Sequence, residues 1–443
     1  MKFFIKKLGC PKNDVDGDFI SGRLIDAGHQ ITGQADDAEA VIINTCGFIL
    51  PAKDESIQEI LFYEKAKQQG KIARLYVTGC LSQRYGEKLL RDIRGIDGIF
   101  GLGELEALAG AMADGVSSRA KILINPAPDL SYLAGTRRYL ESGYCYEYLK
   151  ISDGCDRYCG YCAIPYIRGR YRSRPIEDII SEAQFLAGAG RKELILVSQE
   201  GTGYGRDLKD GTNIISLLLR LEQVAGIEWI RLMYLHPEAV TDELIQYLSF
   251  SPKTLGYFDV PLQHISDTIL SKMNRRINRA RIEEILQKIR DASPDNIIRT
   301  TFIAGLPGET DTEFSELRDF IADFEFERLG VFKYSQEEGT PAARFAAQVS
   351  ETVKDERLDK LMTLQQEIAF RKNIALIDTI QKVIIDKAEP DSLAVGRTKG
   401  DCPDIDQNVL VRDPKVKTGD ILDAKIIMTE GYDLIATTEI GPR

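Results

Sequence analysis

The sequence predicts a mixed α/β protein made of three consecutive segments, and three patterns support this. Residues 1–112 alternate short apolar runs with helical periodicity, and residues 143–376 repeat a strand–helix unit about six times. Residues 377–443 alternate apolar and polar residues between Gly, Asp and Pro turns. Strand–helix alternation predicts parallel sheets covered by helices, whereas short alternating strands predict a small antiparallel barrel. A chain of 443 residues is long enough for two or three domains.

In the N-terminal segment the expected strands are KFFIKKLG, AVIINT and RLYVTG. Helix-like segments such as DVDGDFISGRLIDAG and KDESIQEILFYEKAKQQ follow them, which predicts a parallel α/β domain over 1–112. Residues 113–142 contain the breaker-rich stretch NPAPDLSYLAG and are expected to connect this domain to the next.

In the central segment, 143–376, six expected strands alternate with amphipathic helices; the strands are EYLKISD, ELILVSQ, WIRLMYL, GYFDV, IIRTTFIAG and LGVFKYS. Six units are too few for a complete eight-unit barrel, so we expect a partial, open barrel. Its functional residues should gather at the C-terminal ends of the strands, as they do in complete barrels.

The final segment, 377–443, follows a long polar helix expected over 353–376. Its expected strands are KVIID, NVLVRD, ILDAKIIMT and LIATTE, which predict a small antiparallel barrel of the oligonucleotide-binding type.

Composition and charge exclude some classes of protein. A hydrophobic content of 43% and a charged content of 28% are typical of a globular protein. No apolar run approaches the roughly 18–20 residues of a membrane span, and the apolar part of MKFFIKKLGCPKND is too short for a signal peptide. We therefore expect a cytoplasmic protein with no membrane partner. The net charge of −11 argues against broad electrostatic capture of nucleic acid and suits a basic partner.

The strongest motif is the C-x3-C-x2-C spacing of Cys155, Cys159 and Cys162, directly after the first barrel strand. Three thiolates can bind three irons of a 4Fe–4S cube and leave the fourth iron open for S-adenosylmethionine, whose cleavage yields a 5′-deoxyadenosyl radical. We expect these cysteines to be both metal ligands and catalytic residues. The alternative is a structural zinc site, but zinc normally takes four closed ligands and no fourth Cys or His lies nearby.

A second set of cysteines, Cys10, Cys46 and Cys80, closes three successive expected strands of the N-terminal segment. If these strands are parallel neighbours, all three thiols emerge at one edge of the sheet, where α/β folds build their sites. The alternative is that they are buried, unreactive residues. We predict a second three-thiolate cluster. Cys145 and Cys402 have no companion ligands and are treated as ordinary small residues.

Further candidates lie beside the first cluster motif or at the C-terminal ends of barrel strands. Tyr161 could pack on an adenine ring, and Gly305 in GLPGE could let the backbone approach the cofactor. The remaining candidate pocket residues are Gln199, Gln263, His264 and Lys333. Of this group we expect Tyr161, Gln199, Gly305 and Lys333 to contact the cofactor.

These motifs also resemble those of a known family. The segments are GCPKN at 9–13, INTCG at 43–47, VTGCLSQRY at 77–85, CDRYCGYCAIP at 155–165, PLQH at 261–264 and EEGTPA at 337–342. They resemble the radical methylthiotransferases over essentially the whole chain. The resemblance implies an N-terminal methylthiotransferase domain, a radical S-adenosylmethionine domain and a C-terminal TRAM domain.

Within this family the chain is most similar to the branch that modifies a small-subunit ribosomal protein. The stretch CAIPYIRGRYRSRP at 162–175 and Asp156 after the first cluster cysteine are similar to that branch, whereas the tRNA-modifying relatives usually carry Asn there. One departure is EGT at 200–202, where the branch typically shows Asp-Thr-Thr; it bears on the substrate contacts and not on the cluster ligands.

The resemblance implies two 4Fe–4S clusters, an auxiliary one on Cys10, Cys46 and Cys80 and a radical one on Cys155, Cys159 and Cys162. It implies S-adenosylmethionine as cofactor, an electron donor such as flavodoxin or ferredoxin, and addition of a methylthio group to the β-carbon of an aspartate. The substrate would be a basic small-subunit ribosomal protein, with nucleic acid met only through the ribosome.

The charge of the last segment agrees with a basic protein partner. Residues 377–443 hold nine Lys and Arg against thirteen Asp and Glu, a net charge of −4. A barrel that grips tRNA should instead be basic. Two alternatives stay open: a tRNA methylthiotransferase that acts on a modified adenosine beside the anticodon, and a non-catalytic, zinc-stabilised RNA-binding protein.

Overall fold

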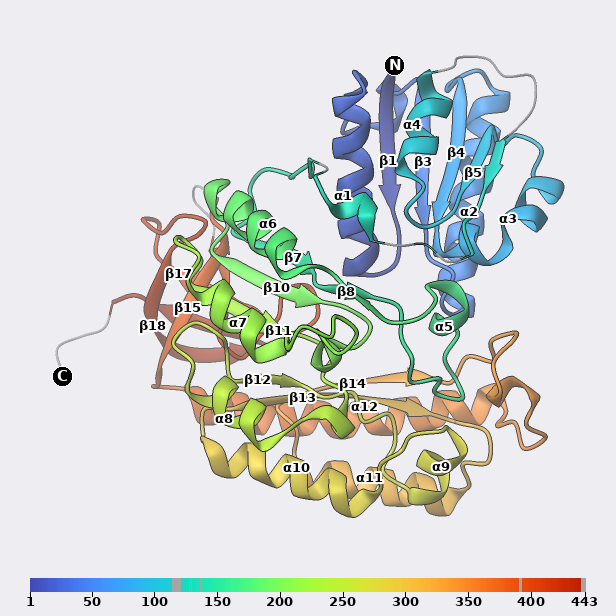
Figure 1. Ribbon diagram of the computed structural model, residues 1–443. Coiled ribbons are helices and arrows are strands. Elements are labelled where there is room, and N and C mark those ends of the chain that lie inside the picture. The colour runs from blue at the N-terminus through green and yellow to red at the C-terminus, as the bar shows by residue number, and fades with distance from the viewer. Residues whose placement is uncertain (114–120, 127, 129, 136, 390–392, 440–443) are drawn as a thin grey trace. The chain divides into compact units, whose positions relative to one another are not determined.

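The computed structural model describes residues 1–113, 121–126, 128, 130–135, 137–389 and 393–439 (Figure 1). The chain packs as two compact units. The first contains Met1–Glu141, Ser152–Asp178 and Ser335–Ala343, and the second is formed by the rest of the described chain. Two stretches of the central segment therefore pack with the N-terminal segment.

The first unit is built on a parallel sheet with the strand order β2-β1-β3-β4-β5-β6. Its strands are β1 (Lys2–Lys7), β2 (Gln30–Ile31), β3 (Ala40–Thr45), β4 (Arg74–Gly79), β5 (Gly98–Phe100) and β6 (Lys121–Leu123). The three strands predicted from sequence are confirmed as β1, β3 and β4. β6 lies in the segment that we expected to be a connection; residues 114–120, 127, 129 and 136 of that segment lie outside the described residues.

Helices cover both faces of this sheet, which is why its central strands are apolar throughout. Every residue of β3 is buried, as expected for a parallel strand between two layers. α1 (Pro11–Asp26) packs with α4 (Leu105–Ala113), whereas α2 (Leu50–Gln68) and α3 (Cys80–Asp92) share a core with alternate residues of β3 and β4, including Val41, Ile43, Leu75 and Val77.

The first unit also holds the segment that follows the first barrel strand in sequence. There β8 (Ser152–Asp153) pairs with β9 (Arg172–Ser173) in an antiparallel manner, and the short helix α5 (Ile164–Ile167) lies between them in sequence. These elements enclose the C-x3-C-x2-C motif.

The second unit contains six parallel strands in two three-stranded sheets, ordered β11-β10-β7 and β12-β13-β14. The strands are β7 (Tyr146–Lys150), β10 (Glu193–Val197), β11 (Trp229–Leu232), β12 (Tyr257–Asp259), β13 (Ile297–Ala304) and β14 (Arg328–Lys333). Leu255 donates a backbone hydrogen bond to Ile230 and links the two sheets. The predicted partial barrel of six strand–helix units is confirmed.

Helices α6 to α11 lie between successive strands of this barrel in sequence, and α12 follows its last strand. Figure 1 shows α10, α11 and α12 along the lower side of the barrel. Their bounds are α6 (Ile176–Gly188), α7 (Ile214–Glu222), α8 (Asp242–Phe250), α9 (Asp267–Lys272), α10 (Arg279–Ala292), α11 (Asp311–Phe324) and α12 (Glu351–Leu376). α12 begins at Glu351, directly after the Ser350 cap and two residues before the predicted start at 353.

The C-terminal segment forms a closed barrel with the order β15-β16-β17-β19-β18. Its strands are β15 (Ile380–Lys387), β16 (Ala394–Thr398), β17 (Val409–Arg412), β18 (Ile421–Glu430) and β19 (Asp433–Thr437). The predicted small barrel is confirmed, but β17 and β19 pair in a parallel manner. β16 was not predicted because its AVGRT sequence holds Gly396, whose place leaves no room for a side chain against the Ile384 carbonyl.

Buried ion pairs join this small barrel to the strands of the partial barrel. Arg397 of β16 is 1% exposed and contacts Glu193 of β10 at 2.8 Å, and Glu193 also contacts Arg231 of β11 at 2.9 Å. Because each of these charges is buried, loss of one partner would leave the other uncompensated.

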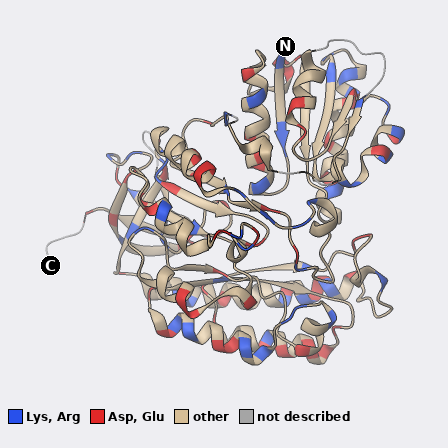
Figure 2. Cartoon of the chain, in the orientation of Figure 1, with Lys and Arg blue, Asp and Glu red and all other residues tan. Residues whose placement is uncertain are grey.

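Charged residues of both signs are interspersed over α10 and α11, as Figure 2 shows. On α10 they form pairs one helical turn apart, such as Arg279 with Glu283 and Arg281 with Glu284. Among the described helices, none combines the length and the apolar character that crossing a membrane would need.

Candidate functional site

Three strand ends of the first unit bring Cys10, Cys46 and Cys80 to one edge of the sheet. β1, β3 and β4 are adjacent and parallel, so their C-terminal ends lie side by side. Cys10 precedes α1, Cys46 directly follows β3, and Cys80 is the first residue of α3. The arrangement that the sequence predicted for these strands is therefore present.

Glycines allow these loops to approach one another closely. A Cβ on Gly9, whose φ is +96°, would lie 2.7 Å from Cys46 Cβ and 2.9 Å from Cys46 Sγ. A Cβ on Gly47 would lie 2.8 Å from the Cys80 carbonyl oxygen. The Cys10 loop thus packs on Cys46, and the Cys46 loop packs on Cys80.

The three thiols also affect one another electrostatically. Burial raises the pKa of the Cys46 thiol to about 12, and negative charge on Cys80 and Cys10 adds to the shift. Burial likewise raises the pKa of Cys80. Grouped thiolates are costly here without a cation, and iron supplies the missing positive charge. The donor set therefore fits an iron–sulfur cluster.

Asn13, in the first turn of α1, fixes the spacing of the three cysteine loops. Its side-chain nitrogen donates to the carbonyl oxygens of Leu8 and Thr45, both at 2.9 Å. Its side-chain oxygen lies 3.8 Å from Cys80 Sγ, which donates a weak hydrogen bond to it. One 1% exposed side chain thus touches all three strand ends.

The second triad, Cys155, Cys159 and Cys162, lies in a tightly turned loop of the same unit. The Cys155 N–H donates to the Gly169 carbonyl at 3.2 Å, and the Cys162 N–H donates to the Cys159 carbonyl at 3.0 Å. Gly154 precedes the triad at φ +76°, where a Cβ would lie 2.1 Å from the Arg170 carbonyl oxygen. The loop is folded back on the segment that follows α5.

Asp156 links the cysteine loop to the same segment after α5. Its carboxylate accepts a 3.1 Å hydrogen bond from the Tyr171 N–H and contacts Arg170 Nε at 3.4 Å. Asp156 therefore shapes the loop that carries this cysteine triad.

Both cysteine triads belong to the first unit, and two features of that unit connect them. Ala163 and Ile167, just after Cys162, form a buried apolar cluster with Cys80 and Leu102. The stretch Ser335–Ala343 reaches both sides: its Ala342 N–H donates to the Gly160 carbonyl at 2.9 Å.

At its other end this stretch is held by Glu337, whose side chain is 1% exposed. The Glu337 carboxylate contacts Lys53 of α2 and Arg84 of α3, both at 2.7 Å. Arg84 also donates to the Gly47 carbonyl at 3.1 Å, next to Cys46. Glu337 therefore joins the Cys46 loop to the stretch that contacts the second triad.

Within the described residues, no three His, Cys, Asp or Glu side chains are arranged to hold a single metal ion. A 4Fe–4S cube does not require this, because each of its cysteines binds a different iron.

The cofactor candidates differ in their surroundings. Tyr161 is half-buried in the first unit. In the second unit both polar atoms of the Gln199 side chain are buried without a hydrogen-bond partner. Gly305 donates its N–H to Glu309 at 3.0 Å, and Lys333 contacts Asp355 of α12 at 2.6 Å. Of these side chains, the Gln199 amide is the one that lacks protein partners.

The other strand-end candidates are part of the protein framework. The Gln263 backbone exchanges hydrogen bonds with β13, donating to Thr301 and accepting from Ile303. His264 is 1% exposed, and its Nε2 lies 3.4 Å from the Glu309 carboxylate. Cys145 lies against Asp386 at 3.3 Å and Cys402 is buried, both in the second unit.

Residues that the sequence did not single out complete the site. Asn13 and Arg168 lie in stretches that were quoted for their family resemblance, without a role for either residue. Ser56 exchanges two 3.0 Å hydrogen bonds with the Cys46 backbone. The one available signal was a set of polar residues, Asn13, Asp16 and Ser56, on helices that follow cysteine-bearing strands.

Comparison with known proteins agrees with this architecture. Residues 149–321 match the Radical SAM superfamily, residues 2–101 match the Uncharacterized protein family UPF0004, and residues 377–438 match the TRAM domain. Together with the parallel barrel strands and the C-x3-C-x2-C loop, these matches define a member of the radical S-adenosylmethionine superfamily.

Two relatives narrow this class. A protein of Desulfitobacterium hafniense named ribosomal protein uS12 methylthiotransferase RimO is 41% identical over 435 residues, with 98% of each chain covered. A protein of the same name from Bdellovibrio bacteriovorus is 43% identical over 436 residues, covering 97% of this chain and 95% of its own. The chain belongs to the RimO family.

Among solved structures, the cobalamin- and [4Fe-4S]-bound radical S-adenosylmethionine methyltransferase TsrM of Kitasatospora setae is similar in fold. The TM-score is 0.54 at 15% identity, with 86% of this chain and 80% of that chain covered.

Proposed function

We propose that this protein adds a methylthio group to the β-carbon of an aspartate in ribosomal protein uS12. The observation that carries the proposal is the presence of two three-cysteine sets in one compact unit, in a chain whose relatives are named uS12 methylthiotransferases. A radical initiator needs one such set; a second set is what sulfur insertion adds.

In this proposal Cys155, Cys159 and Cys162 hold the cluster that binds S-adenosylmethionine, and Cys10, Cys46 and Cys80 hold a second 4Fe–4S cluster. When bound, the two clusters and S-adenosylmethionine supply a carbon-centred radical, a sulfur atom and a methyl group. The protein residues hold the two cysteine sets at a fixed spacing. Ala163 and Ile167 pack against Cys80 and keep water from the space between them.

We assign Gln199 and Tyr161 to S-adenosylmethionine. A buried amide without a partner is costly, and a polar cofactor group would satisfy it. Gly305 and Lys333 remain proposed contacts, but their N–H and ammonium groups already have partners in Glu309 and Asp355. Their participation would require those contacts to exchange.

We assign residues 1–112 to the methylthiotransferase domain, 143–376 to the radical S-adenosylmethionine domain and 377–443 to the TRAM domain, with 113–142 as a connection. The net charge of −4 over residues 377–443 supports docking onto a basic ribosomal protein. A small redox protein such as flavodoxin or ferredoxin would deliver the electron to the cluster held by Cys155, Cys159 and Cys162.

The experiment uses the full-length protein, reconstituted anaerobically with iron and sulfide and supplied with S-adenosylmethionine and a reductant. Purified uS12, 30S subunits and total tRNA, each from cells that lack both methylthiotransferases, serve as parallel substrates. We expect mass spectrometry to find one methylthio group on an aspartate of uS12. Methylthio-adenosine in tRNA with uS12 unmodified would overturn the proposal in favour of the tRNA enzyme. A protein that binds zinc and leaves S-adenosylmethionine intact would overturn it in favour of an RNA-binding protein.

A further inference from the structure

We propose that Arg168 is a positioning residue for the N-terminal cluster, the one proposed at Cys10, Cys46 and Cys80. Its guanidinium holds the Cys80 corner of the N-terminal triad and sets the reduction potential of the cluster bound there, from within the segment that carries the other triad. This inference rests on the proposed function, because it needs iron at Cys10, Cys46 and Cys80.

Arg168 is held in place by four contacts in the interior of the first unit. Its side chain is 1% exposed. Nη1 donates to Asp153 Oδ2 at 2.8 Å, and both terminal nitrogens donate to Asp16 Oδ2 at 3.2 Å. Nη2 also donates to Asn13 Oδ1 at 3.0 Å. A guanidinium gripped on both edges in this way has one available orientation.

This orientation brings its charge to the cysteines. Arg168 and the Cys80 thiol donate to the same oxygen, Asn13 Oδ1. Arg168 therefore places a positive charge beside the Cys80 corner of the N-terminal triad.

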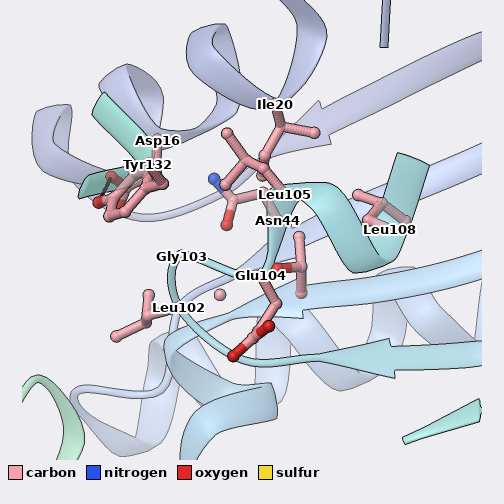
Figure 3. A pocket seen from close by; sticks show the side chains of 11 residues that line it. Asp16, Ile20, Asn44, Leu102, Gly103, Glu104, Leu105, Leu108 and Tyr132 are labelled. Carbon is pink, nitrogen blue, oxygen red and sulfur yellow. Dashed lines mark hydrogen bonds between the residues drawn. The ribbon is translucent and has the colours of Figure 1, made fainter. Parts of the chain in front are cut away.

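The charge of Arg168 is permanent. A guanidinium stays protonated in proteins, and the carboxylates of Asp153 and Asp16 contact this one directly. Asp16 is held in turn by Tyr132, whose hydroxyl donates to Asp16 Oδ1 at 2.8 Å. Both side chains line a small pocket of the first unit, where Figure 3 shows them next to each other.

The position of Arg168 in the chain gives the contact a consequence for the reaction. Asp153 lies two residues before Cys155, and Arg168 lies six residues after Cys162. The contacts from Asp153 through Arg168 to Asn13 thus tie both flanks of the triad of Cys155, Cys159 and Cys162 to the N-terminal triad. The proposed reaction joins sulfur from one cluster to a carbon activated at the other, so a fixed spacing between them is required.

A nearby positive charge stabilises the reduced, more negative form of an iron–sulfur cluster and raises its potential. The test isolates the N-terminal cluster in full-length protein in which Cys155, Cys159 and Cys162 are all replaced by Ala. Into this parent we introduce Arg168→Met, Arg168→Lys and Asp153→Asn. Arg170→Met is the matched control, because Arg170 lies in the same segment with its side chain 81% exposed.

The readouts are the iron content, the midpoint potential from an electron paramagnetic resonance titration, and the rate of iron loss to a chelator. We expect Arg168→Met to lower the potential and speed iron loss at least tenfold, and Arg168→Lys to restore part of both. Asp153→Asn, which removes a negative charge, should raise the potential. Arg170→Met should match the parent.

The outcomes separate the claim that a cluster binds at Cys10, Cys46 and Cys80 from the claim that Arg168 sets its potential. A parent that binds no iron overturns the proposed second cluster and this inference with it. A parent that binds the cluster, with Arg168→Met, Arg168→Lys and Asp153→Asn all at the parent's potential, overturns the role of Arg168 alone. If Arg168→Met fails to fold, Asp153→Asn and Arg168→Lys decide, since damage to folding does not raise a potential.

Discussion

The side-chain nitrogen of Asn13 lies 2.9 Å from the carbonyl oxygen of Thr45 and donates a hydrogen bond to it. Thr45 is the residue before Cys46, and the same nitrogen donates to Leu8, two residues before Cys10. A single amide therefore fixes the separation of two strand ends that bear cysteines. The backbone carbonyl of Asn13 also accepts a 2.7 Å hydrogen bond from the Asn44 side chain, which fixes the start of α1 against β3.

Asn13→Ala should cost about 2 kcal/mol of unfolding free energy, because it leaves buried backbone carbonyls without donors. The same substitution should halve the iron content of the reconstituted protein, from about eight irons to about four. Chemical denaturation and iron analysis measure the two effects. The control is Asn213→Ala, which removes the cap of α7 in the second unit and should destabilise without loss of iron. Full iron content in Asn13→Ala would contradict the role of this amide.

Gly9→Ala should prevent the second cluster from forming. The new Cβ would overlap Cys46 Cβ and Sγ, so the Cys46 loop must move. Gly28→Ala is the matched control, because Gly28 has a similar φ of +88° but no atom within 4 Å of an added Cβ. Both variants should lose about 1 kcal/mol to backbone strain, and only Gly9→Ala should lose iron. Equal iron content in the two variants would show that the Gly9–Cys46 contact is dispensable.

The Glu337 carboxylate should make stability depend on pH in the acid range. Burial alone would raise its pKa, but hydrogen bonds from Lys53 and Arg84 outweigh burial and lower the pKa below its usual value. A carboxyl whose pKa is lowered by folding stabilises the protein above its unfolded pKa of about 4.3, and this stabilisation is lost as the pH falls further.

Glu337→Gln should therefore lose about 1–3 kcal/mol at neutral pH and show a flatter stability profile below about pH 4. Denaturant titrations of the metal-free protein at several pH values measure this, with the exposed neighbour variant Glu338→Gln as control. A profile of Glu337→Gln parallel to that of the unmodified protein would rule out this ion pair as its source.

Gln199→Leu should affect stability and cofactor binding in opposite directions. Removal of a buried amide without partners should stabilise the cofactor-free protein by about 1 kcal/mol. Loss of the proposed contact should weaken S-adenosylmethionine binding about tenfold, which corresponds to about 1.4 kcal/mol. Thermal unfolding and titration calorimetry measure the two, with the exposed Gln223→Leu as control. Unchanged affinity for S-adenosylmethionine would remove Gln199 from the cofactor site.

Sequence patterns predicted the elements that bear cysteines because those elements are locally encoded. The apolar strands Ala40–Thr45 and Arg74–Gly79 each end at the residue before a cysteine, so both the strand and the position of its thiol can be inferred. Tandem strand–helix units predicted the six parallel strands for the same reason. β16 lacked such a pattern, since Gly396 and Arg397 occupy its centre.

The support around the cysteines could not be predicted, because it depends on contacts between distant parts of the chain. Arg168 meets Asp16 across 152 positions, and Lys53 meets Glu337 across 284. No local period encodes such pairs. Only the folded chain shows that Ser335–Ala343 packs with the N-terminal sheet rather than with the strand that precedes it.

The central claim is that the two cysteine sets have different tasks, and one assay tests it most directly. Reconstituted Cys155→Ala and Cys46→Ala proteins are incubated with S-adenosylmethionine, reductant and uS12, and 5′-deoxyadenosine and methylthio-aspartate are quantified together. We expect Cys155→Ala to form neither product. We expect Cys46→Ala to form 5′-deoxyadenosine but no methylthio-aspartate. Full methylthiolation of uS12 by Cys46→Ala would contradict the account.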